Sequence, residues 1–85
     1  MDVSAVEEGV RVYTALRDDR RLSISDVRAG FERLRGYSKP VIEEISRRLM
    51  YTPHGSRTEI LDRLLSNLEG IKVSQYKMDQ ILTGT

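Results

Sequence analysis

The segment SRTEILDRLLSNLEG, residues 56–70, carries the clearest helix signal of the chain. Ser56 and Glu59 have the spacing of a capping box, in which each side chain accepts a hydrogen bond from the other residue's backbone amide. Gly70 is of a residue type that commonly follows the last turn of a helix. Between these signals, apolar residues fall on one helical face: Ile60, Leu61, Leu64, Leu65 and Leu68. The sequence therefore predicts a helix over residues 56–69 whose wide apolar face packs against a core.

The same spacing of apolar residues predicts further helices on both sides of this segment. Ser4 and Glu7 have the spacing of a second capping box, and Ser25 and Ser38 are expected N-caps. No segment shows a convincing strand pattern. The expected helices, besides the one above, cover residues 4–16, 25–35, 38–49 and 74–82. We therefore expect an all-α fold, a single domain over residues 1–85 with four or five helices.

The tyrosines divide into two groups by their position in these helices. Tyr13 and Tyr76 fall on apolar faces, Tyr76 together with Ile81 and Leu82, so these residues are expected in the core. Tyr37 and Tyr51 flank turns, where a half-buried ring with a solvated hydroxyl is the usual outcome.

Composition limits the class of protein. The 85 residues fit one small domain at most, they include no cysteine, and their net charge is +1. No apolar run approaches the 18 or more residues of a transmembrane helix, and the acidic residues near the N-terminus argue against a signal peptide. We therefore expect a cytoplasmic protein with no membrane partner.

The sequence gives only weak evidence for a catalytic site or a metal site. His54, the one histidine, lies two residues before Ser56, which raises a pairing of base and nucleophile. Ser56 is needed as a helix cap, however, and no third residue is placed to orient the imidazole. One histidine without cysteines does not make a zinc site. There is no glycine-rich nucleotide loop either. We therefore expect a non-catalytic protein without metal or cofactor.

The start of the helix over 56–69 is a candidate anion site. It opens with Gly55, Ser56 and Arg57, and its first amides lack intrahelical acceptors, so together with the helix dipole they favour a phosphate. Arg57 opposes that dipole, because acidic residues are preferred in a first turn. A cation in this position indicates an anionic partner from outside. Against this interpretation, the capping box already satisfies some of the amides.

Residues 55–65 resemble the second half of a SAP domain, a helix–extended–helix DNA-binding motif. That family has Gly, any residue, Lys, any residue, Glu and Leu here, with a further Leu downstream; Gly55 and Glu59 match and Arg57 keeps the charge of the Lys. Tyr51 stands at an upstream apolar position of the motif, and Ile42 and Ile45 at apolar positions of its first helix. The resemblance covers residues 38–68, a little over a third of the chain.

Two positions depart from the family pattern. Met50 stands where the family often has Gly, and Ser46 stands at a position that is often apolar. The resemblance says nothing about residues 1–36 and 71–85, which we expect to be a helical scaffold that completes the core, because a motif of this size buries too little alone.

The resemblance implies binding of double-stranded DNA. Contacts to phosphates position a protein without reading bases, so weak sequence preference is expected. The residues that the resemblance and the local charge assign to this contact are His54, Gly55, Ser56 and Arg57, with Arg63, Arg47 and Arg48 as further basic groups.

The alternative is a helical protein–protein interaction module: an adaptor, an inhibitor or an assembly domain. The near-neutral net charge favours it, because autonomous DNA-binding domains are often more basic, although residues 28–48 are mildly basic. Its contact surface would be an exposed apolar face, for which the candidates are Met50, Tyr51, Ile71 and Met78.

Overall fold

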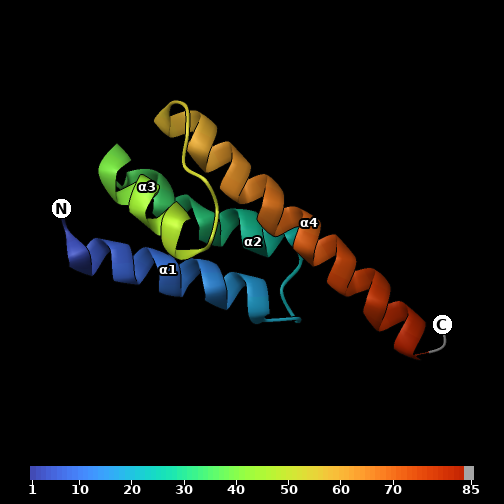
Figure 1. Ribbon diagram of the computed structural model, residues 1–85. Coiled ribbons are helices and arrows are strands. Elements are labelled where there is room, and N and C mark those ends of the chain that lie inside the picture. The colour runs from blue at the N-terminus through green and yellow to red at the C-terminus, as the bar shows by residue number, and fades with distance from the viewer. Residues whose placement is uncertain (84–85) are drawn as a thin grey trace.

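The computed structural model describes residues 1–83 as a bundle of four α-helices and one 3-10 helix (Figure 1). The described residues contain no strand, so the all-α prediction is confirmed. Residues 84–85 of the predicted domain lie outside the described residues. In chain order the elements are α1 (Val3–Asp18), α2 (Ile24–Phe31), η1 (Glu32–Gly36), α3 (Lys39–Arg48) and α4 (Arg57–Thr83).

One apolar core joins the four α-helices. The predicted face of α4 is buried in it, except that Leu65 is only partly buried. Tyr13 is fully buried as predicted, and its hydroxyl donates a hydrogen bond to the Leu64 carbonyl at 3.2 Å. Tyr37 and Tyr51 are half-buried, also as predicted. The core residues are Val6, Tyr13, Val27, Phe31, Leu34, Val41, Ile42, Ile45, Ile60, Leu61, Leu64 and Leu68.

Two of the predicted N-caps are wrong by two residues. Asp2, not Ser4, caps α1, because its carboxylate accepts from the Ala5 amide at 3.0 Å and Ser4 already lies inside the helix. Ser23, not Ser25, caps α2. Ser23 has an acidic residue three positions later, Asp26, so the two form a reciprocal capping box that Ser25 has no partner to form.

The predicted break at Gly70 and the separate helix over 74–82 are also wrong, because α4 is one continuous helix of 27 residues. Gly within a helix costs about 1 kcal/mol relative to Ala. Polar contacts beyond Gly70 offset this cost. The Lys72 ammonium donates to the Asp19 carbonyl at 2.6 Å, and the Gln75 amide donates to the Arg17 carbonyl at 2.7 Å.

The end of α3 reverses the chain toward the start of α4. The amide of Tyr51 donates to the Ser46 carbonyl, and that of Met50 to the Arg47 carbonyl, both at 2.9 Å. These are the two bonds of a Schellman motif, in which the residue after the C-cap has a left-handed conformation. Met50 takes that position with φ of 70°. The following loop runs back along α3, so that α3 and α4 begin at the same end of the bundle (Figure 1).

Candidate functional site

The start of α4 is closed by the predicted capping box. The Ser56 amide donates to the Glu59 carboxylate at 3.0 Å, and the Glu59 amide donates to the Ser56 hydroxyl oxygen at 3.1 Å. The hydrogen bonds from Ser56 hold the pKa of Glu59 below its usual value. A negative charge is therefore fixed at the helix start, where a phosphate would approach. The hydroxyl of Ser56 serves as a cap rather than as the partner of His54.

Arg57 finds its partner inside the domain. Its Nε donates to the Tyr37 carbonyl at 2.8 Å, and its Nη2 donates to the Arg35 carbonyl. Both acceptors lie at the end of η1, where carbonyls lack intrahelical donors. The guanidinium thus caps a neighbouring helix and holds the two elements together. This contact explains a cation in the first turn of α4 without an external ligand.

The other predicted basic groups are also engaged. Arg63 donates to the His54 carbonyl, so its side chain turns back over the loop before α4. Arg47 and Arg48 both pair with Glu44, at 3.3 and 3.4 Å. They lie at the end of α3, about 15 Å along that helix from its start, and α4 begins beside that start. The structure therefore groups His54, Gly55, Ser56, Arg57 and Arg63, but Arg47 and Arg48 lie apart from them.

A second candidate surface was predicted only in part from the sequence, through Ile71 and Met78. We call residues 70–83 the projecting end of α4, because it extends past the other helices (Figure 1). Tyr76, Ile81 and Leu82 are 66%, 73% and 76% exposed, so their predicted burial in the core is wrong. Val73 and Met78 are exposed on the same segment. The expected apolar face finds no core because α1 and α2 cover only the first part of α4.

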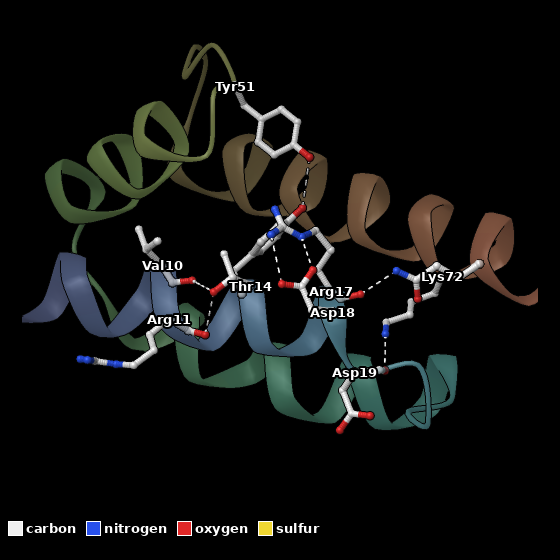
Figure 2. A network of polar contacts seen from close by, with 10 residues as sticks. Val10, Arg11, Thr14, Arg17, Asp18, Asp19, Tyr51 and Lys72 are labelled. Carbon is white, nitrogen blue, oxygen red and sulfur yellow. Dashed lines mark hydrogen bonds and ion pairs between the residues drawn. The ribbon is translucent and has the colours of Figure 1, made fainter.

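The inner side of the projecting end is polar and anchored. Lys72 and Gln75 bond to the end of α1, as described above, and Asp79 forms an ion pair with Arg20 at 2.6 Å. Figure 2 shows the Lys72 ammonium beside the Asp19 backbone. Spacings of three and four residues place these three side chains on one helical face. The projecting end is therefore fixed on the bundle by polar contacts, and its apolar side chains lie on the remaining surface.

Two features of the alternative surface proposed from the sequence differ from expectation. Met50 is 90% exposed, but it lies at the far end of α3 rather than on α4. Tyr51 turns inward, where its ring meets the Tyr13 ring edge-on at a centroid distance of 6.4 Å. Of the four candidates, Ile71 and Met78 share one helical face of the projecting end, because they lie seven residues apart.

A groove lies between the start of α2 and the projecting end. Its volume is about 490 Å³, within the range of pockets that bind small ligands. Four apolar side chains, two serines and Lys72 line it: Leu22, Ser23, Ile24, Ser25, Lys72, Val73 and Tyr76.

Residues 1–83 hold no group of three or more acidic or histidine side chains arranged to bind a metal ion. Within the same range, no helix has the length and apolarity needed to cross a bilayer. Comparison with protein-family models, curated proteins and solved structures gives no significant match. The geometry of the two candidate surfaces is therefore the basis for a functional proposal.

Proposed function

We propose that this domain is a protein-interaction module whose contact surface is the projecting end of α4. The exposure of Tyr76, Ile81 and Leu82 within seven residues of one helix carries the proposal. Several large apolar side chains exposed close together on a small domain indicate an interaction site, because they leave apolar area in water that a partner would cover.

Anchoring of the projecting end supports this function. An isolated helix of this length is marginal in water. Lys72, Gln75 and Asp79 hold it on the α1–α2 side, so its outer surface is presented in a fixed conformation. A surface that is ordered before binding loses less conformational entropy when the partner docks.

The charge distribution supports a protein partner over a polyanion. Arg57 and Arg63 donate to backbone carbonyls of their own domain, and Arg28 pairs with Glu69 at 2.5 Å. These guanidinium groups are already engaged inside the domain, which leaves fewer of their donors for a phosphate. The net charge of +1 adds little attraction at a distance.

Affinity capture with surface variants tests the proposal. The test variant combines Ile81→Asp and Leu82→Asp, and the matched control is Met50→Asp, which is also exposed but lies just after the end of α3. We expect the wild-type chain and the control variant to capture the same protein from cell extract. The test variant should fail to capture it. Titration calorimetry with that purified protein should show the same order of affinities. Equal capture by all three chains would contradict the proposal.

Duplex DNA binding is the second candidate, and one observation favours it. The Arg57 and Thr58 amides have no hydrogen-bond acceptor among residues 1–83, so the start of α4 retains two donors for a phosphate. The order of α3, a loop and α4 also fits a helix–extended–helix motif. The left-handed Met50, at a position often Gly in the SAP family, supports the same resemblance.

Fluorescence anisotropy with labelled duplexes tests this second candidate. Thr58→Glu suits the first turn of a helix but repels a phosphate, and Asn67→Glu places the same charge on an exposed mid-helix site. If DNA binds here, Thr58→Glu weakens binding and Asn67→Glu has little effect. The slope of log affinity against log salt should be about −2 to −4, for two to four phosphates. Absence of binding at low salt excludes this function.

A further inference from the structure

The groove between α2 and the projecting end is suited to an apolar side chain. Leu22 and Ile24 form one wall and are half-buried, and Val73 and Tyr76 form the other and are exposed. Ligand pockets of this kind combine apolar walls with a few polar groups that fix the orientation of the ligand. Here the lining residues that carry polar groups are Lys72, Ser23 and Ser25.

Lys72 gives the groove a charge preference. It is only 5% exposed, yet it forms no ion pair with any described residue, and its ammonium donates to the Asp19 carbonyl. Hydrogen bonds from Arg17 and Arg21 are the main cause of the lowered pKa values of the Asp18 and Asp19 carboxyls, and the positive charge of Lys72 adds a smaller effect. Those two carboxylates bond to Arg17 and Arg21 instead. Lys72 therefore has no directly bonded countercharge, and a carboxylate in the groove would supply one.

We propose that this groove binds the C-terminus of a partner protein, with an apolar last side chain between Val73 and Ile24 and the free carboxylate at Lys72. This inference rests on the proposed protein-interaction function and names the chemistry of the partner.

The geometry favours a chain end over an internal acidic residue. At a C-terminus, the carboxylate and the last side chain leave the same Cα, so a single residue brings both groups to a groove that Lys72 and Val73 both line. In an extended chain, an acidic residue next to an apolar one points to the opposite face and cannot reach the same groove. The Ser23 and Ser25 hydroxyls can donate to the second carboxylate oxygen.

A pair of peptides tests the charge preference directly. The ¹⁵N-labelled full chain is titrated with a hexapeptide ending in leucine, once as the free acid and once as the C-terminal amide. We expect the amide resonances of Leu22, Ser25, Val73 and Tyr76 to shift with the acid, and the amide form to bind at least tenfold more weakly. No shifts at millimolar peptide, equal binding of both forms, or shifts confined to other residues would each overturn the inference.

Variants of the chain localise the effect. Tyr76→Ala removes an exposed groove wall and should weaken binding of the acid severalfold, whereas Ile81→Ala, equally exposed but outside the lining, should not. Lys72→Met should abolish the preference for the acid, and Lys72→Arg should retain it; melting curves identify a variant that fails to fold. If Lys72→Met unfolds, the Tyr76→Ala variant and the comparison of the two peptides still test the inference.

This test separates two kinds of failure. If neither peptide binds, but Ile81→Asp with Leu82→Asp loses a captured protein, only the groove inference falls. If that variant captures as wild type does, the proposed function falls as well.

Discussion

Arg57, in the first turn of α4, donates from its Nε to the Tyr37 carbonyl across a gap of 20 residues, at 2.8 Å. The same guanidinium donates to the Arg35 carbonyl. The pair of bonds ties the start of α4 to the end of η1. The fork shape of the guanidinium is essential, because a lysine ammonium cannot match two acceptors with the same fixed geometry.

Arg57→Lys should therefore destabilise the domain even though it keeps the charge. Hydrogen bonds that involve a charged group contribute about 1.5–3 kcal/mol, and we expect a loss of that order in the free energy of unfolding. Urea unfolding followed by circular dichroism measures it. Arg11→Lys is the matched control, because the Arg11 side chain forms no hydrogen bond or ion pair within residues 1–83. Equal unfolding midpoints for the two variants would contradict the capping role.

Met50→Gly should stabilise the protein. Met50 has φ of 70° and an almost fully exposed side chain, so the substitution removes strain and little packing. A left-handed conformation costs a non-glycine residue about 1–2 kcal/mol, and the greater entropy of Gly in the unfolded chain returns part of the gain. We expect a net gain of about 0.5–1 kcal/mol, or a rise in Tm of several degrees.

Met50→Ala is the control for this prediction. It removes the same side chain but keeps the Cβ that causes the strain, so its Tm should stay near that of wild type. A lower Tm for Met50→Gly than for Met50→Ala would show that the Schellman geometry is absent in solution.

Leu64→Ala should be severe. Leu64 is 1% exposed and belongs to the apolar core, and the Tyr13 hydroxyl bonds to its carbonyl. Truncation of a buried leucine costs about 2–5 kcal/mol, and a small domain has about 5 kcal/mol to lose. Thermal unfolding should show a largely unfolded variant at 37 °C. Ile81→Ala, on the exposed surface, should change stability by less than about 0.5 kcal/mol.

Glu59 should contribute to acid sensitivity. Its pKa is lowered in the folded protein by the Ser56 amide, so its contribution to stability is present above the unfolded pKa of about 4.3 and is lost as pH falls through the folded value. Glu59→Gln can still accept from that amide but does not titrate. The free energy of unfolding should therefore fall less between pH 7 and pH 3 in the variant than in wild type. An identical fall in both would show that the carboxylate does not hold the amide.

Local signals made part of this fold predictable. The box of Ser56 and Glu59 and the apolar face that follows it are encoded within a dozen residues, and both are present in the structure. Gly70 was misjudged because the contacts that keep α4 helical join Lys72 and Gln75 to residues more than 50 positions earlier. Patterns among neighbouring residues cannot reveal hydrogen-bond partners that are so distant in the sequence.

The internal partners of the candidate site could not be predicted for the same reason. A cation in a first turn suggests a missing anion, but Arg57 has its acceptors on η1. The loop after α3 runs back along that helix, so Arg47 and Arg48 are separated from Arg57 despite their closeness in sequence. The exposure of the surface near Tyr76 could not be predicted from the sequence, because its apolar residues have the same spacing as those of a buried helical face.

The most direct test of the claim that the projecting end of α4 binds a protein is site-specific photo-crosslinking. A photo-reactive benzoyl-phenylalanine replaces Ile81 in one chain and Arg11, on the exposed side of α1, in another. Irradiation in cells should give a discrete protein adduct from position 81 and none from position 11. Adducts of the same mass from both positions, or none from position 81, would contradict the account.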